Sequence, residues 1–397
     1  MNAELLNSAV TFARGFRAAG VNCGIRKDKF DLALIAADMP ASAAGVFTTN
    51  RCCAAPVQLS KKHLAAGVCR AILVNAGNAN AATGIAGDAA ALRCAKALAQ
   101  RLRCPVTEIA VASTGKIGIP LPADKICAGL DTLIARLSVT GGADAAQAIL
   151  TTDTFAKERA LEIRVDGKPV RIGGMAKGAG MIMPNLATML AFITTDAAVA
   201  PATLRRLLAR AAGVSFNRVT VDSDTSTNDS LFMLASGAAG VRVTSRNERV
   251  FYRALESVCV ALAQLLARDG EGATKFVSIT AAGCRTTAEA DAIARTVANS
   301  PLVKTALFGS NPNWGRILAA AGRAGVAFDP ATVNVQVNGV LIVKAGQGAA
   351  SDPARVQAAF SQHDLDIQIL LRKGKASATI WTCDLSHQYI DINVDYN

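Results

Sequence analysis

The stretch that decides the fold runs from residue 173 to residue 198 and reads GGMAKGAGMIMPNLATMLAFITTDAA. Small, flexible residues precede Thr188, and an apolar, β-prone run from Met189 to Thr194 follows it. This pattern predicts an exposed bend that leads into a buried strand, because glycines permit backbone conformations that other residues avoid and short apolar runs form buried strands. We therefore expect Thr188 to be the first residue of a strand.

A threonine in this position can act on its own chain. Its hydroxyl can attack the carbonyl carbon of Ala187 if the glycines and Pro184 upstream hold the backbone in a strained conformation. Hydrolysis of the resulting ester would divide the chain into residues 1–187 and 188–397. Thr188 would then have a free α-amine. The unperturbed pKa of such an amine, about 7.7–8.0, suits it to deprotonate the hydroxyl of Thr188 itself. Taken alone, an Ala-Thr pair before a strand is more often structural than catalytic.

Composition limits the class of protein. With 51% hydrophobic residues among 397, the chain can bury a large core. No apolar run reaches the roughly 18–20 residues that span a bilayer, and the N-terminus lacks a basic start before an apolar core, so we expect a cytoplasmic protein without a membrane segment. The ten cysteines contain no CxxC pair and only three histidines are present. This pattern favours buried, reduced thiols and predicts no metal.

The net charge of +12 raises the alternative of a basic nucleic-acid-binding protein. Aromatic residues make up only 5% of the chain, and the basic residues are spread along it. A positive field would equally serve an enzyme whose substrates carry carboxylates. We therefore expect no nucleic-acid partner.

Strands and helices are expected to alternate along the chain. The pairs Asp166-Gly167 and Asn338-Gly339 lie between apolar runs and predict two-residue hairpin turns. Residues 75–78 are expected to form a loop after a buried strand, residues 109–116 a strand that runs into a glycine turn, and residues 389–394 a last strand. Helical spacing of apolar residues predicts helices over 87–103, 201–212 and 252–268. These elements indicate a mixed α/β fold of layered sheets and helices.

Several long strings together resemble one family. KGAGMIMPNLATML, residues 177–190, is similar to the signature of the self-processing ornithine acetyltransferases, the bifunctional glutamate N-acetyltransferases of arginine biosynthesis. The resemblance covers nearly the whole chain and implies a self-cleaving, N-terminal-nucleophile fold built from an α chain, 1–187, and a β chain, 188–397. It continues through VNAGNANAATG at 74–84, STGKIGIPLP at 113–122, TTDT at 151–154, VDSDTSTNDS at 221–230, GEGATK at 270–275 and GSNPNWGRI at 309–317.

The resemblance also implies roles for single residues. Thr188 matches the nucleophile, with cleavage between Ala187 and Thr188, and Thr114 and Gly115 match the oxyanion-hole pair. A hydroxyl beside a glycine amide is a compact way to offer two donors to an oxyanion. Family chains end in Ser or Thr five residues after an Asn, whereas this chain stops at Asn397. Substrate contacts are implied for Lys177, Thr188, Glu271 and Asn393, and for one threonine of the TTDT string, Thr154 or alternatively Thr151.

The activity implied is ping-pong acetyl transfer. Thr188 would take the acetyl group from N-acetylornithine and pass it to glutamate, with no cofactor and with acetyl-CoA as a possible second donor. The resemblance further implies a heterotetramer of two α and two β chains. An N-terminal-nucleophile amidohydrolase or peptidase would use the same nucleophile with water as the acceptor, and it is the enzyme alternative.

Overall fold

The computed structural model describes residue 6, residues 9–183 and residues 189–394. The chain packs into two compact units and crosses between them several times. The first unit is made of Met1–Gly178, Pro184–Asn217 and Thr225–Leu266, and the second of Ala179–Met183, Arg218–Asp224 and Ala267–Asn397. The predicted cleavage point, Ala187-Thr188, lies outside the described residues. The division into residues 1–187 and 188–397 therefore stays a prediction about a covalent bond.

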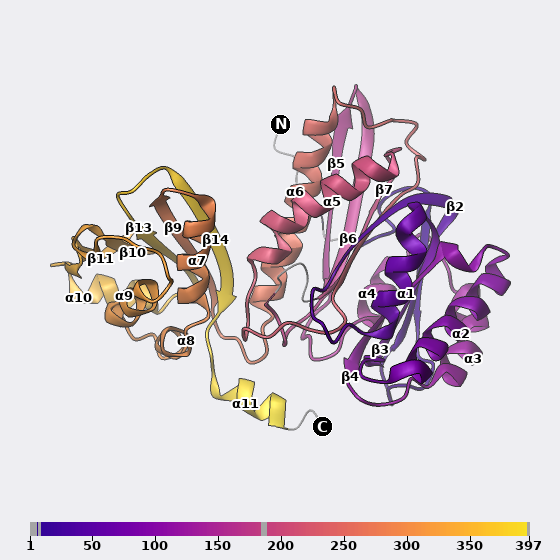
Figure 1. Ribbon diagram of the computed structural model, residues 1–397, viewed down its shortest axis with the longest axis horizontal. Helices are drawn as coiled ribbons and strands as arrows, with labels where there is room; N and C mark the ends of the chain where they lie inside the picture. Colours follow the sequence, from indigo (N-terminus) through magenta and orange to yellow (C-terminus); the bar gives the residue numbers. More distant parts are fainter. Residues whose placement is uncertain (1–5, 7–8, 184–188, 395–397) are drawn as a thin grey trace. The chain divides into compact units, whose positions relative to one another are not determined.

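The first unit is built on an eight-stranded mixed sheet (Figure 1). Its strands follow the order β4-β3-β2-β8-β7-β6-β5, and β1 pairs with β2. The pairs β3/β4 and β7/β8 are parallel and the others are antiparallel. The strands are β1 (Phe16–Val21), β2 (Leu32–Phe47), β3 (Val68–Asn78), β4 (Ile109–Lys116), β5 (Lys157–Val165), β6 (Lys168–Lys177), β7 (Leu190–Thr195) and β8 (Ser230–Ala235).

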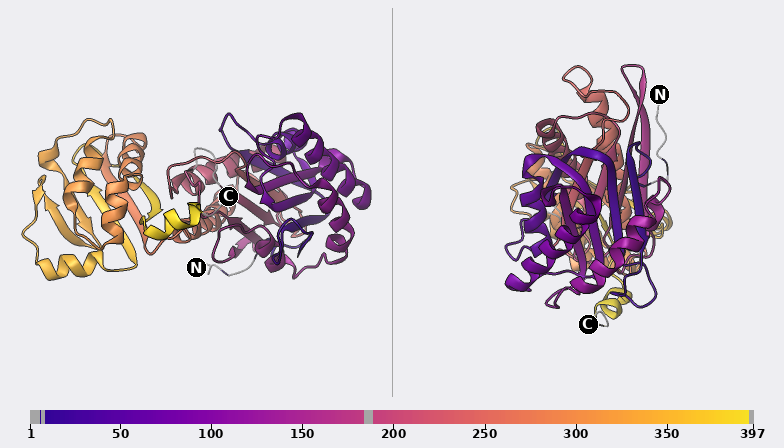
Figure 2. Two further views of the ribbon diagram at one scale, coloured as in Figure 1. Left: turned by 90° about the horizontal axis from the view of Figure 1, so that it is seen from below. Right: turned by 90° about the vertical axis from the view of Figure 1, so that its right-hand side faces the viewer.

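Helices cover both faces of this sheet. Successive residues of a strand point to opposite faces, so Leu34 of β2 joins a core with Leu98 and Leu130, while its neighbour Ile35 joins a separate core with Ala145. Figure 2 shows the strands lying between these helices. The helices are α1 (Ala55–His63), α2 (Gly84–Leu102), α3 (Ala123–Ala135), α4 (Gly142–Ala148), α5 (Pro201–Val214) and α6 (Glu248–Arg268), with 3₁₀ turns η1 (Leu64–Ala66), η2 (Val106–Glu108) and η3 (Phe216–Arg218).

Among the described helices, α6 alone has the length and apolar composition that could cross a membrane. Its apolar residues Leu255, Val258 and Leu262 are fully buried in the protein. A core helix of a soluble protein passes the same test, so α6 is a weak indication of a membrane.

The second unit has its own sheet and its own core. Six strands follow the order β12-β11-β10-β13-β9-β14, and Ile279, Ile293 and Ile367 are buried between this sheet and its helices. The strands are β9 (Phe276–Cys284), β10 (Asn334–Val337), β11 (Val340–Lys344), β12 (Gln347–Gly348), β13 (Asp364–Leu370) and β14 (Ala376–Cys383). The helices are α7 (Thr287–Ala298), α8 (Pro301–Phe308), α9 (Trp314–Gly322), α10 (Pro353–Phe360) and α11 (His387–Val394), with the 3₁₀ turn η4 (Pro330–Thr332).

The mixed α/β prediction and both hairpin predictions are confirmed. Asp166 and Gly167 have φ angles of 51° and 77°, and Asn338 and Gly339 have 46° and 77°. Two consecutive residues with positive φ form the turn whose twist matches the flanking strands. These turns connect β5 to β6 and β10 to β11.

Two local predictions are wrong. Residues 75–78 are not a loop but the end of β3, which pairs in parallel with the end of β4. Residues 389–394 belong to helix α11 and not to a strand. The apolar alternation of the tail resembles a strand, but a strand needs a neighbour, and the Asn393 side chain instead donates to the Tyr389 carbonyl one helical turn back, at 2.9 Å.

Candidate active site

Thr114 and Gly115 lie at the end of β4, where the ladder with β3 becomes irregular. Gly115 has a φ of +131°, and a Cβ placed on it would lie 2.3 Å from the carbonyl carbon of Gly77. Both the backbone conformation and the close strand contact therefore exclude a side chain here. The backbone of this predicted oxyanion pair is fixed by strand pairing, which is the preorganisation that oxyanion stabilisation requires.

Lys177, the last residue of β6, brings the predicted residues of the first unit together. Its Nζ donates to the Thr151 hydroxyl at 2.7 Å and to the Thr114 hydroxyl at 3.2 Å. Because the Thr114 oxygen accepts from Lys177, the hydroxyl hydrogen of Thr114 is directed elsewhere and can be donated to an oxyanion. Thr151 of the TTDT string thus contacts Lys177, and Thr154 of the same string is exposed.

Asp153, inside the same string, holds this cluster in place. Its side chain is fully buried and forms ion pairs with Lys157 at 2.6 Å and with Lys177 at 3.8 Å. Its oxygens also accept from the amides of Gly178 at 2.7 Å and Thr151 at 3.0 Å. Burial alone would raise the pKa of Asp153, but the two lysines and these hydrogen bonds outweigh burial and hold that pKa below its usual range.

Sequence reasoning missed Asp153. The threonines beside it drew attention because the family resemblance involves hydroxyl contacts. The available signal was an acidic residue four positions before Lys157, the first residue of β5.

We expect Asp153→Asn to lower the free energy of unfolding by about 3–5 kcal/mol at neutral pH, because it leaves two lysines without their buried carboxylate. Urea unfolding measures this effect. Asp131→Asn is the matched control, since Asp131 pairs with Arg101 on the surface and a surface pair contributes far less. An Asp153→Asn variant no less stable than Asp131→Asn would contradict the role given to Asp153.

The same variant has an expected pH dependence. The folded-state pKa of Asp153 lies below the unfolded value of about 3.9, so its contribution is present above about pH 4 and is lost as the pH falls towards the folded-state pKa. The stability difference between the wild type and Asp153→Asn should therefore narrow below about pH 4.

In the second unit, Glu271 and Asn393 contact each other. The Asn393 side chain donates to Glu271 Oε2 at 2.8 Å, and the Glu271 amide donates to the Ala179 carbonyl at 2.9 Å. A Cβ on Gly180 would lie 2.3 Å from a Glu271 oxygen, so the glycine allows the carboxylate to approach the backbone. The KGAG string thus ends against one of the predicted substrate residues.

Asp222 anchors the segment that follows KGAG. Its carboxylate accepts from the amides of Met181 at 2.6 Å and Ile182 at 2.8 Å. Burial raises the pKa of Asp222, although these hydrogen bonds oppose the shift. Met181 itself has a φ of +55°, an unusual backbone conformation for a residue with a side chain. Asp222 therefore links the start of the VDSDTSTNDS string to the segment that follows KGAG.

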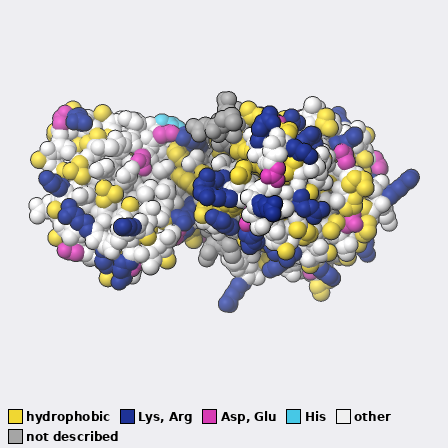
Figure 3. All heavy atoms as spheres, turned by 90° about the horizontal axis from the view of Figure 1, so that it is seen from above, with side chains coloured by type: hydrophobic (Ala, Val, Ile, Leu, Met, Phe, Trp, Pro, Cys, Tyr) yellow, Lys and Arg dark blue, Asp and Glu magenta, His cyan; other side chains and the backbone are white. Residues whose placement is uncertain are grey.

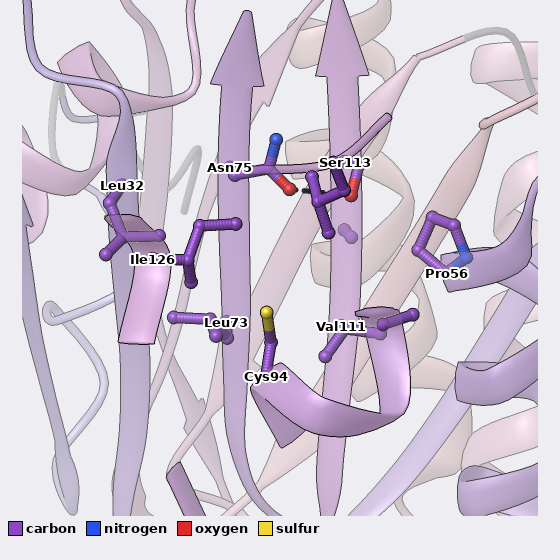
Figure 4. Close-up of a pocket in the computed structure, with 11 residues that line it drawn as sticks. Leu32, Pro56, Leu73, Asn75, Cys94, Val111, Ser113 and Ile126 are labelled. Atoms are coloured by element: carbon purple, nitrogen blue, oxygen red, sulfur yellow. Dashed lines mark hydrogen bonds between the residues drawn. The ribbon is translucent and has the colours of Figure 1, made fainter. Parts of the chain in front are cut away.

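A small cavity in the first unit has Asn75 and Ser113 at one end (Figure 4). The Ser113 hydroxyl donates to Asn75 Oδ1 at 2.7 Å, and the remaining lining is mostly apolar, including Leu73, Cys94 and Ile126. Its volume of about 10 Å³ is at the lower limit for one water molecule. The cavity is therefore too small to be the substrate site.

Within the described part of the chain, no group of three or more His, Cys, Asp or Glu side chains could hold a metal ion. The chemistry that this arrangement offers is hydrogen-bond donation and positive charge around Thr114. Both suit a reaction in which negative charge develops on an oxygen.

Comparison with known proteins gives the family. Residues 17–397 match the ArgJ family. The chain belongs to the ArgJ family. A relative from Chlorobaculum tepidum, named arginine biosynthesis bifunctional protein ArgJ, is 50% identical, and the alignment covers 99% of this chain and 98% of the relative. Relatives of the same name from Gloeobacter violaceus and Thermosynechococcus vestitus are 46% and 45% identical, with 99% of this chain covered in both.

A solved ArgJ structure agrees with this assignment. A crystal structure of the ArgJ protein from Bacillus halodurans is 35% identical with a TM-score of 0.50, covering 51% of this chain and 97% of that chain. An ornithine acetyltransferase from Mycobacterium tuberculosis, solved in complex with ornithine, is 43% identical with a TM-score of 0.44, covering 47% of this chain and all of that one. The ArgJ-family chain is thus an enzyme of arginine biosynthesis, as the sequence resemblance implied.

Proposed function

We propose that this ArgJ-family chain cleaves itself between Ala187 and Thr188 and then moves an acetyl group from N-acetylornithine to glutamate through an acetyl-Thr188 intermediate. The observation that carries the proposal is the contact of Lys177 with Thr114. It brings a cation and a directed hydroxyl together at a rigid strand end, next to Gly115. Such a constellation stabilises an oxyanion during acyl transfer.

Acetyl transfer proceeds in two half-reactions. The Thr188 oxygen bonds to the acetyl carbon of N-acetylornithine, its proton passes to the Thr188 α-amine, and the Thr114 hydroxyl and Gly115 amide hold the oxyanion. The carbon–nitrogen bond then breaks, and ornithine leaves with that proton on its amine. The glutamate amine next attacks the acetyl ester, and Thr188 regains its hydroxyl as N-acetylglutamate leaves.

Substrate recognition is assigned to charged and hydroxyl side chains that the sequence resemblance names. Lys177 offers positive charge to a substrate carboxylate, with the Thr151 hydroxyl beside it. Glu271, held by Asn393, offers negative charge to a substrate ammonium group. Thr154 is the alternative hydroxyl of the TTDT string. Ornithine and glutamate both carry such charged groups, so one set of contacts can serve both half-reactions.

The comparisons support further parts of the proposal. A solved ArgJ chain that covers 51% of this chain over nearly its whole length is what a cleaved relative would present. Relatives named as bifunctional favour acetyl-CoA as a second donor, with no bound cofactor. We also expect a cytoplasmic heterotetramer of two α and two β chains.

A nucleic-acid partner is not expected. Figure 3 shows Lys and Arg side chains spread over the face drawn there, with hydrophobic and acidic side chains between them. Several arginines of the chain form ion pairs with acidic residues, such as Arg206 with Glu248 and Arg171 with Glu162.

Purified enzyme supplied with N-acetylornithine and glutamate should form ornithine and N-acetylglutamate in equal amounts. Initial rates at several fixed glutamate concentrations should give parallel double-reciprocal lines, because ornithine leaves before glutamate reacts. Release of acetate without N-acetylglutamate would instead identify the amidohydrolase alternative. Replacing N-acetylornithine with acetyl-CoA in the same assay tests the second donor.

A further inference from the structure

Asp229 is a buried carboxylate that the roles above leave unused. It directly precedes β8 and exposes only 2% of its surface. Its Oδ2 has no hydrogen-bond partner among the residues that the structure describes. Burying an unpaired carboxylate oxygen is costly, and such groups gather at functional sites.

Asp229 lies at the start of the strand that follows the predicted cleavage point. Ser230 pairs with Leu190 in parallel register, and the Ser230 amide donates to the Met189 carbonyl at 2.9 Å. The Met189 amide is in turn a hydrogen-bond donor to the Asp229 carboxylate. Met189 follows the predicted nucleophile in the sequence, so the Asp229 carboxylate contacts the chain one residue after Thr188.

The neighbouring residue connects Asp229 to the oxyanion strand. The Asn228 side chain donates to the Ser113 carbonyl at 2.9 Å and also to the Ala79 carbonyl. Ser113 immediately precedes Thr114. Asn228 therefore contacts the strand that carries Thr114, and Asp229 contacts Met189, just before β7.

Charged and titratable groups surround Asp229 on several elements. Burial raises the pKa of Asp229 well above its usual range, while Ser226 and the charge of Lys177 on β6 oppose this shift. Cys53, before α1, also faces Asp229; burial raises the pKa of this thiol, and Lys61 lowers it. A raised pKa makes the ionised carboxylate a stronger proton acceptor.

The cleavage step needs a base that Thr188 cannot supply. After cleavage the α-amine of Thr188 can accept the hydroxyl proton, but before cleavage that nitrogen is an amide and has no basic lone pair. Lys177 is an ammonium group engaged with Thr114, Thr151 and Asp153, so it donates and does not accept. The Asp229 carboxylate, in contrast, can accept a proton, and it contacts Met189.

We propose that the Asp229 carboxylate accepts the Thr188 hydroxyl proton when the Ala187-Thr188 bond is cleaved, an inference that rests on the function proposed above. The Thr188 oxygen bonds to the Ala187 carbonyl carbon as its proton moves to Asp229. The carbon–nitrogen bond then breaks, and Asp229 returns the proton to the Thr188 nitrogen, giving an ester and a free amine. Water hydrolyses the ester, which restores the hydroxyl and leaves a carboxylate on Ala187.

The test follows cleavage of the full-length chain on denaturing gels after expression and during incubation. Asp229→Asn should be cleaved about 10²–10⁴-fold more slowly than the wild type, the usual contribution of a positioned base. Asp229→Glu should keep measurable cleavage. Formate should accelerate cleavage of Asp229→Ala, since it can replace the lost carboxylate in the space left, and chloride should not.

Asp196→Asn is the matched control. Asp196 is a fully buried carboxylate just beyond the other end of β7, where it pairs with Arg14 at 2.8 Å. This variant should be cleaved like the wild type. Circular dichroism confirms folding, and if Asp229→Asn does not fold, the formate response of Asp229→Ala decides.

Wild-type cleavage rates in folded Asp229→Asn, or no formate response in Asp229→Ala, would overturn the role of Asp229. Those results would leave the proposed function intact as long as the wild type is cleaved before Thr188. A wild-type chain that is active and uncleaved would instead remove the proposed function itself.

Discussion

Thr188→Ala is expected to remain a single chain of 397 residues and to lose acetyl transfer. The same hydroxyl is assigned to chain cleavage and to acetyl transfer, so its removal abolishes both. We expect the transfer rate to fall by about 10⁴-fold or more, the scale found when an acyl-transfer enzyme loses its nucleophile. A denaturing gel and a transfer assay measure the two losses on the same preparation.

Thr188→Ser separates loss of the hydroxyl from loss of the side chain. Serine keeps the nucleophilic oxygen, so this variant should still be cleaved into residues 1–187 and 188–397 and should still transfer acetyl groups. Wild-type transfer by uncleaved Thr188→Ala would show that neither the nucleophile nor the cleavage is as described.

Thr114→Ala is expected to lower the turnover rate by about 10²–10³-fold, the usual loss when one oxyanion donor is removed. KM should change little, because the hydroxyl acts on charge that develops in the transition state. The Lys177 amine retains Thr151 and Asp153 as partners, so folding should be preserved. Steady-state kinetics on the variant measure both parameters.

Thr114→Ser is the matched variant for this position. It keeps a hydroxyl within reach of Lys177 and should stay within about tenfold of the wild-type turnover rate. If Thr114→Ala turned over at the wild-type rate, the oxyanion would have to be held without the Thr114 side chain.

The parts of the fold that could be predicted from sequence are those with local causes. The Asp166-Gly167 and Asn338-Gly339 turns follow from two residues that tolerate positive φ between apolar runs, and both have such angles. Long helices such as α6 follow from apolar spacing over many residues.

The errors share a non-local cause. The end of β3 was predicted as a loop, because Asn75, Gly77 and Asn78 favour turns, yet it pairs with β4 over these residues. The tail at 389–394 read as a strand, but it forms α11. Pairing depends on a partner distant in the sequence, which local patterns do not contain.

The residues of the candidate site were likewise predicted only in part from the sequence. Thr114, Lys177 and Thr151 were named through family resemblance, and the structure brings these three side chains into contact. The carboxylates that hold or adjoin them were missed. Asp153 and Asp229 stand among threonines, serines and asparagines that look solvent-exposed in sequence, whereas both carboxylates are buried.

The central claim is that acetyl transfer passes through a covalent intermediate on Thr188, and intact mass spectrometry tests it most directly. Processed enzyme mixed with N-acetylornithine alone should gain one acetyl group on the fragment that begins at Thr188. That group should disappear when glutamate is added, because the acceptor removes it from the threonine oxygen. An active enzyme whose 188–397 fragment never gains the acetyl group under these conditions would contradict the account.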